Sequence, residues 1–169
     1  MTVIEQFLGQ RVEIPDDLKY DSNQGLWARE QDPDIVFGLS RPAVVLAGGV
    51  NDLDWLVRDG IAVREGQDVV FMITGKISYI HTPSNGIIFF NQEVKQNPAL
   101  AAEDPYGKGW LFRIKMDAHR QAAWKRLADA QHYIAKLKET EGFKNPEGLK
   151  GGVSGICKAV YSGIREQKC

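Results

Sequence analysis

The sequence predicts a β-rich α+β fold, built as a small barrel or sandwich of short strands that is followed by one long helix. The first observation is a series of short β-branched and aromatic segments separated by turn signals, within the first two thirds of the chain. The second is a change to helical periodicity further on, in a stretch without proline or glycine. Frequent turns between short strands are typical of small barrels and sandwiches.

The composition is that of one ordinary globular core. The chain has 169 residues, of which 43% are hydrophobic and 25% are charged. Lysine and arginine number 21 against 22 acids, so no overall field favours nucleic acid or an anionic membrane as a partner. No apolar run has the length of a membrane span, and residues 1–10 lack the pattern of a secretory signal. We therefore expect a cytoplasmic protein.

The first expected elements are a hairpin and a short helix. The segment GLWAREQDPDIVFGLS, from Gly25 to Ser40, has strand-forming residues on both sides of an Asp-Pro-Asp turn. The sequence RPAVVLAGG follows, with a proline suited to a first helical turn and two glycines suited to stop a helix. We expect a helix from Pro42 to Ala47.

Five short strands are expected next. Each is a run of apolar residues bounded by turns with the sequences RDG, REGQ, TGK or PSNG. The predicted strands are Leu53 to Val57, Ile61 to Val63, Val69 to Ile73, Ile77 to Ile80 and Gly86 to Phe90.

One long helix is expected from Asp117 to Thr140. This stretch is rich in Ala, Lys, Leu and Gln. Its apolar side chains fall on one stripe, which contains Trp124, Leu127, Ile134 and Leu137. Gly142 and the residues after it end the helix, and GLKGGVSG predicts a flexible joint.

Lys76 is the one charged residue in an otherwise apolar stretch, VVFMITGKISYI. A lysine that follows a glycine at the tip of a tight hairpin is either a solvated turn residue or a group that a modifying enzyme can reach. Attachment of a group-carrying cofactor suits such a lysine, because the protein supplies placement and the cofactor supplies the chemistry.

Four segments carry a resemblance to a known family. They are GLWAREQDPDIVFGLS, GIAVREGQDVVFMITGK, TPSNGIIFFNQEV and NPALAAEDPYGKGWLFRI, and the last is the most specific. In this order they resemble the H protein of the glycine cleavage system, a lipoyl carrier, and its wider family, over about Tyr20 to Leu137. The sequence contains no acid/base pair, nucleophile elbow or phosphate loop, so we expect no catalysis by the chain alone. The resemblance implies a hybrid barrel-sandwich with a C-terminal helix and tail, and lipoate in amide linkage to Lys76. It divides the chain into an N-terminal extension (1–19), the carrier domain (20–141) and a linker with a tail (142–169).

The hairpin departs from the family pattern in two ways. Ile73 stands where the family has an acidic residue three positions before the lysine. The spacing from Lys76 to Pro83 is one residue shorter than usual, so an ungapped alignment places Gly75 at the modified position. Lys76 is thus either the lipoylation site or a remnant in an unlipoylated scaffold or regulator. Biotin is less favoured, because Gly75 and Ile77 replace the methionines that flank a biotinyl lysine.

The Gly-Lys pair and the altered acidic position are also similar to the lipoate-binding proteins of the heterodisulfide-reductase-like sulfur oxidation system. This resemblance implies a sulfur-containing cargo. The implied partners are a lipoate ligase or transferase, the heterodisulfide-reductase-like complex and dihydrolipoamide dehydrogenase. The alternative is an aminomethyl cargo, exchanged with the glycine cleavage enzymes.

Two cysteines, Cys157 and Cys169, lie in the expected tail. They are too few for a disulfide framework, and no histidine stands at metal-ligand spacing from them. They are either incidental small residues or thiols that exchange with each other or with the dithiolane of lipoate. An adjacent lysine beside each favours the thiolate, so both are possible redox residues. The three histidines of the chain form no ligand cluster, and no metal site is expected.

Overall fold

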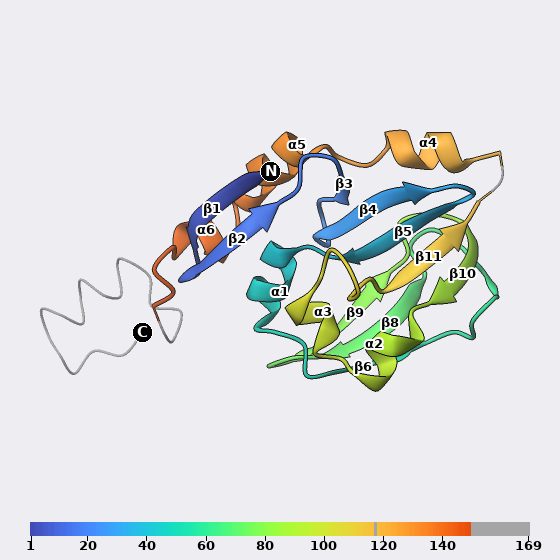
Figure 1. Cartoon of the computed structure of the whole chain (residues 1–169), viewed down its shortest axis with the longest axis horizontal. Helices are drawn as coiled ribbons and strands as arrows, with labels where there is room; N and C mark the ends of the chain where they lie inside the picture. The colour runs from blue at the N-terminus through green and yellow to red at the C-terminus, as the bar shows by residue number, and fades with distance from the viewer. Residues whose placement is uncertain (117, 150–169) are drawn as a thin grey trace, which may run out of the picture.

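The computed structural model describes residues 1–116 and 118–149, and two antiparallel sheets form its centre (Figure 1). The larger sheet has the order β3-β4-β5-β11-β10-β7, with β3 (Lys19–Asp21), β4 (Leu26–Gln31), β5 (Asp34–Leu39), β7 (Ala62–Val63), β10 (Gly86–Phe90) and β11 (Phe112–Lys115). The smaller sheet has the order β6-β8-β9, with β6 (Asp52–Trp55), β8 (Asp68–Ile73) and β9 (Ile77–His81). A separate hairpin consists of β1 (Thr2–Phe7) and β2 (Gln10–Ile14).

The helices are short and lie outside the sheets (Figure 1). They are α1 (Arg41–Ala47), α2 (Gln92–Gln96), α3 (Leu100–Glu103), α4 (Arg120–Lys125), α5 (Ala130–Leu137) and α6 (Glu141–Lys144). None of these described helices has the length and apolar character needed to cross a membrane.

The main core lies between the two sheets, because alternate residues of each strand face inward. In the smaller sheet Leu53 lies opposite Met72, and both are buried. In the larger sheet Phe37 lies opposite Phe112, with ring centroids 5.4 Å apart. The smaller sheet therefore has one buried face and one outer face.

The structure confirms the β-rich α+β sandwich and most of its predicted elements. The first hairpin is β4 and β5, which pair without interruption over six residues. The short helix is α1, in which the Ser40 side chain accepts a hydrogen bond from the Ala43 N–H and Gly48 ends the helix at a φ of 80°. The five short strands are β6 to β10, with ends within two residues of those predicted.

The prediction of one continuous helix from Asp117 to Thr140 is wrong. Between α4 and α5, Ala128 forms a β-bridge with Tyr20, and both backbone hydrogen bonds of this bridge are 2.8 Å long. Asp129 then caps α5 by accepting a hydrogen bond from the His132 N–H at 2.9 Å. Periodicity did not reveal the break, because a tertiary contact and a cap make it, without proline or glycine.

Gly142 was expected to end the helical region, but it lies within α6. A Cβ atom at this position would overlap the ring of Phe7, which comes from β1. The glycine thus permits close contact between α6 and the N-terminal hairpin, and Phe143 adds an edge-to-face contact with the same ring at 5.9 Å. The residues before β3 therefore pack on the C-terminal helices.

Trp27 is the largest fully buried side chain, and it lies directly opposite Gly38 in the β4–β5 pair. A Cβ atom on Gly38 would come within 2.7 Å of three indole atoms, so this close pairing requires glycine. The indole Nε1–H donates a 2.7 Å hydrogen bond to the carbonyl of Pro105. Pro105 belongs to the Asp-Pro-Tyr-Gly turn, so this turn holds the buried indole of Trp27.

Three tyrosines, of which Tyr20 and Tyr133 are buried and Tyr106 is half-buried, join the N-terminal hairpin, α1 and α5 to the larger sheet. The rings of Tyr20 and Tyr133 stack with centroids 4.6 Å apart, and the Tyr133 hydroxyl lies 2.6 Å from that of Ser40. The Tyr106 hydroxyl donates to the Glu13 carbonyl at 2.6 Å. Burial raises the pKa of all three phenols above its ordinary value.

This tyrosine cluster predicts loss of stability in alkaline solution. The folded state keeps the phenols neutral, so their contribution to the free energy of unfolding is constant below the unfolded pKa of about 10. Above it, each phenol lowers that free energy by about 1.4 kcal/mol per pH unit, until the higher folded pKa is reached. Guanidinium unfolding at about pH 8 and about pH 11, on either side of the unfolded pKa, measures the loss. Tyr20→Phe should reduce the dependence on pH, and an unchanged dependence in that variant would contradict the assignment.

Candidate functional site

Lys76 is the last residue of the three-residue loop that joins β8 to β9. The loop is closed by the ladder pair of Ile73 and Ile77 and by a 2.9 Å hydrogen bond from the Thr74 N–H to the Lys76 carbonyl. Thr74 is buried, whereas Gly75 and Lys76 are exposed. Among the residues that the structure describes, the Lys76 ammonium has no hydrogen bond and no ion pair. The lysine is therefore presented to solvent at the end of an ordered hairpin.

The other end of the hairpin is fixed to the larger sheet by Gln24. Its side-chain amide donates to the His81 carbonyl at 2.8 Å and accepts from the His81 N–H at 2.9 Å. The amide thus occupies the position that a neighbouring strand would take at the edge of β9. A further hydrogen bond of 2.8 Å to Asp21 orients the glutamine. Nothing in the local sequence signals this contact, which spans 57 positions.

A groove of about 350 Å³ lies between β9 and α1, beside the hairpin tip. Lys76 lines it at one end. Its apolar walls come from both elements and from the strands behind them, and they include Leu39, Ala43, Leu46, Met72 and Ile80. The exposed lysine therefore adjoins a surface that can hold an alkyl chain.

The outer face of β8 and β9 carries four apolar side chains next to Lys76. Ile73 lies opposite Ile77, and Phe71 lies opposite Tyr79 with ring centroids 5.6 Å apart. Ile77 is 61% exposed and Tyr79 is 56% exposed, although both come from a segment predicted as an ordinary strand. This exposed apolar face could have been predicted from the alternation of side chains along the two strands. Residues 70, 72 and 80 face the core, whereas residues 71, 73, 77 and 79 do not.

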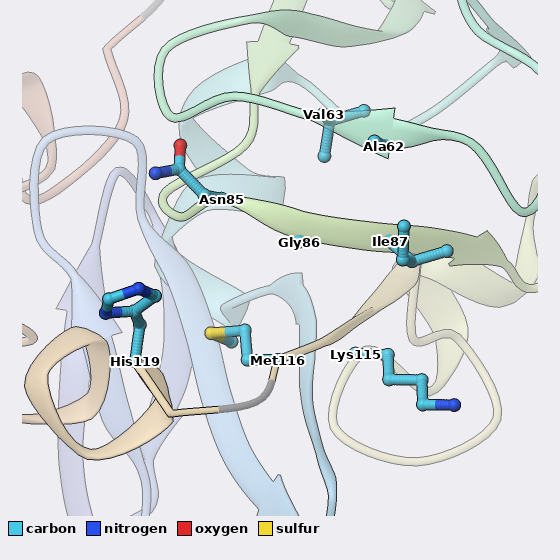
Figure 2. Close-up of a pocket in the computed structure, with 8 residues that line it drawn as sticks. All are labelled: Ala62, Val63, Asn85, Gly86, Ile87, Lys115, Met116 and His119. Atoms are coloured by element: carbon cyan, nitrogen blue, oxygen red, sulfur yellow. The ribbon is translucent and has the colours of Figure 1, made fainter.

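A second hollow of about 350 Å³ lies along β7, β10 and the end of β11 (Figure 2). Figure 2 shows Asn85, Met116 and His119 around it, with Val63 and Ile87 on the neighbouring strands. None of the residues expected to form a site lines it. The hairpin with its adjoining groove is therefore the candidate site.

Of the other residues considered from the sequence, His81 belongs to this hairpin and lines the groove, and the rest lie apart from it or outside the described residues. Cys157 and Cys169 lie outside residues 1–116 and 118–149. Within those ranges, no group of three or more His, Cys, Asp or Glu side chains is placed to hold a metal ion. His81 ends β9, whereas His119 and His132 lie at the start of α4 and within α5.

Three comparisons with known proteins agree with each other. A family model described as glycine cleavage H-protein matches residues 18–140. A probable glycine cleavage system H protein 2 from Sulfurisphaera tokodaii is 36% identical over 132 residues, which are 75% of this chain and 87% of that protein. The glycine cleavage system H protein of Aeromonas hydrophila is 37% identical over 123 residues, with 71% and 92% covered. The crystal structure of such an H protein from Mycobacterium marinum aligns with a TM-score of 0.61 at 26% identity, over 73% of this chain and 98% of that one.

Proposed function

Since the chain belongs to the glycine cleavage H-protein family, whose members are non-catalytic proteins with lipoate on a lysine, we propose that Lys76 is the lipoylated residue. The single observation that carries this assignment is the exposed, unpaired position of Lys76 at the hairpin tip, among the described residues. The carrier domain of the proposal is residues 20–141, with residues 1–19 and 142–169 as an extension and a tail. The match over residues 18–140 supports these limits.

The residues around Lys76 are suited to hold a covalently attached lipoyl group. The lysine offers a primary amine that is free to form an amide, and the adjoining groove of about 350 Å³ offers aliphatic side chains to an alkyl chain. The groove residues that would contact the chain are Leu39, Ala43, Leu46 and Met72. Gly75 adds no side chain beside the amide, so the approach to the lysine stays open.

The residues of the chain bind, place and present the arm. When bound, lipoate supplies a dithiolane that accepts and releases the carried group at sulfur. Gln24 holds the base of the hairpin, and the ladder from Asp68 to Ile73 holds the tip at a fixed distance from the core. Tethering in this way raises the effective concentration of the cargo at the active site of each partner. The described residues of the hairpin and its base thus contribute the position of the arm.

For the cargo we propose a sulfur-containing intermediate of the heterodisulfide-reductase-like oxidation system, in the cytoplasm. Gly75 before the lysine and Ile73 in place of an acid support this subfamily. An aminomethyl cargo exchanged with the glycine cleavage enzymes is the second candidate, and it is favoured by the relatives, which are named as glycine cleavage system H proteins. In either case a lipoate ligase or transferase loads the carrier, and dihydrolipoamide dehydrogenase recycles it. Cys157 and Cys169 are proposed as thiols that exchange with the arm.

The proposal predicts a lipoyl adduct on Lys76 in protein purified from its own host. The test is the intact mass under non-reducing conditions, followed by peptide mapping of residues 69–91. The adduct on Lys76 is the expected result, and an additional mass on the arm would identify the cargo. An unmodified Lys76 in a host supplied with lipoate would instead support the scaffold alternative, for which Ile73 and the short hairpin are the evidence.

A further inference from the structure

The outer face of the β8–β9 hairpin is an apolar surface on which two side chains are exposed and two are half-buried. It consists of Phe71, Ile73, Ile77 and Tyr79, and we refer to it as the hairpin face. Two of these side chains are more than half exposed, which is uncommon for a contiguous apolar group on a free surface. The hairpin face begins at the residue after Lys76, so any protein that receives the lysine also meets this face.

One side of the hairpin face is bordered by carboxylates. In β6, Asp52 lies opposite Ile73 and Asp54 lies opposite Phe71, so both acids share the outer face. Asp54 is paired with Lys95 at 3.1 Å. The Asp52 carboxylate accepts a hydrogen bond from the Leu53 N–H and has no cation partner among the described residues. A partner with an apolar contact region and a lysine or arginine facing Asp52 would complement this surface.

We propose that the hairpin face is the docking surface for the enzyme that attaches lipoate to Lys76. The proposal rests on the function proposed above. In the attachment step the unprotonated Nζ attacks the acyl carbon of an enzyme-held lipoyl adenylate. A C–N amide bond forms, the C–O bond to the phosphate breaks, AMP leaves, and the nitrogen loses one proton. Because Nζ must enter the active site, the enzyme must contact the end of the hairpin, and the apolar face lies there.

The size of the hairpin face favours a transient enzyme over a second copy of the chain. Four side chains supply a few hundred square ångströms, whereas a stable complex buries about 800 Å² on each partner. A second copy seated on this face would also cover Lys76, which must stay accessible to its partners. A small apolar contact that is steered by one free carboxylate suits an enzyme that binds, acylates and leaves.

The test measures lipoyl attachment to the full chain with a purified lipoate–protein ligase, lipoate and ATP, with the intact mass as readout. Ile77→Thr combined with Tyr79→Thr is expected to lower kcat/KM by about tenfold or more, mainly through a higher KM. Threonine keeps the strand propensity of these exposed positions, so the unfolding midpoint should fall only slightly, through the lost contact between the rings of Phe71 and Tyr79. The matched control is Ile61→Thr, which also changes an exposed isoleucine but one next to β7 in the larger sheet.

A second pair of variants tests the carboxylate. Asp52→Asn should weaken the dependence of KM on salt, whereas Asp17→Asn, in the turn before β3, should not. Equal kcat/KM in the wild type and the double threonine variant would overturn the docking proposal and leave the lipoyl carrier intact. Dimerisation of the wild type that the double variant abolishes would assign the face to a second copy and overturn the proposal. No attachment to the wild type, here and in its own host, would overturn both proposals together.

Discussion

Lys76→Arg is expected to abolish lipoyl attachment completely while leaving the fold unchanged. Amide formation needs a neutral primary amine, and the guanidinium of arginine stays protonated in proteins. Lys76 is exposed and has no ion pair or hydrogen bond through its side chain within the described residues, so arginine should not change the free energy of unfolding. The intact mass after incubation with ligase, lipoate and ATP measures the loss of lipoyl attachment. Growth of the host on the substrate of the pathway measures the loss of function.

Lys115→Arg is the matched control, because it changes another exposed lysine, the last residue of β11, and keeps Lys76. Full attachment to this control and none to Lys76→Arg would establish the site. Attachment to both variants would show that another lysine is used.

The one-residue difference in spacing can be tested in the same assay. A Cβ atom on Gly75 would meet no heavy atom within 4 Å, so a lysine can be placed there without a clash. In the combination Gly75→Lys with Lys76→Gly, the lysine moves by one position along the loop. We expect attachment to fall sharply, because a side chain one position earlier in this tight loop leaves the backbone in a different direction.

Trp27→Ala is expected to lower the free energy of unfolding by about 4 kcal/mol or more. Truncation of a buried tryptophan costs about 3–5 kcal/mol through lost contacts and the cavity that remains. The Pro105 carbonyl also loses its buried hydrogen bond, which adds roughly 1–3 kcal/mol unless water replaces the donor. Because small domains are stable by about 5–15 kcal/mol in total, this variant should be close to unfolding at 37 °C. Urea unfolding followed by circular dichroism measures the change.

A double-mutant cycle with Gly38 makes this prediction specific. Gly38→Ala alone should destabilise the protein, because its methyl group would overlap the indole. In the Trp27→Ala background the same change should cost little or stabilise, since the space is empty and alanine is better than glycine within a strand. If the cost of Gly38→Ala is the same in both backgrounds, the steric explanation is wrong.

Local patterns predicted the strands and the short helix, because each of those elements is specified by its own residues. The β4–β5 hairpin follows from an Asp-Pro-Asp turn between strand formers, and α1 follows from a proline at its start and glycines at its end. The position of Lys76 at a hairpin tip was predicted in the same way, from Gly75 between two apolar runs.

The features that could not be predicted all depend on residues far apart in the chain. The break between α4 and α5 is made by Tyr20, which lies 108 positions before Ala128. The groove beside Lys76 lies between α1 and β9, and the alternation within β9 gives no information about the helix on the other side of the groove. The contact of Gln24 with His81 is of the same kind. Local propensity therefore predicts the hairpin that carries Lys76, but it does not predict the groove beside that lysine.

The double hydrogen bond between Gln24 and His81 has a consequence for how this protein can evolve. It secures the hairpin at the end opposite to Lys76, so the fold does not depend on the identity of the exposed residues at the tip. Mutations at positions 75, 77 and 79 can then accumulate without a penalty in stability. Selection for a new enzyme partner can act on the tip while the scaffold is inherited unchanged, so duplicated copies of one ancestral gene could serve different pathways.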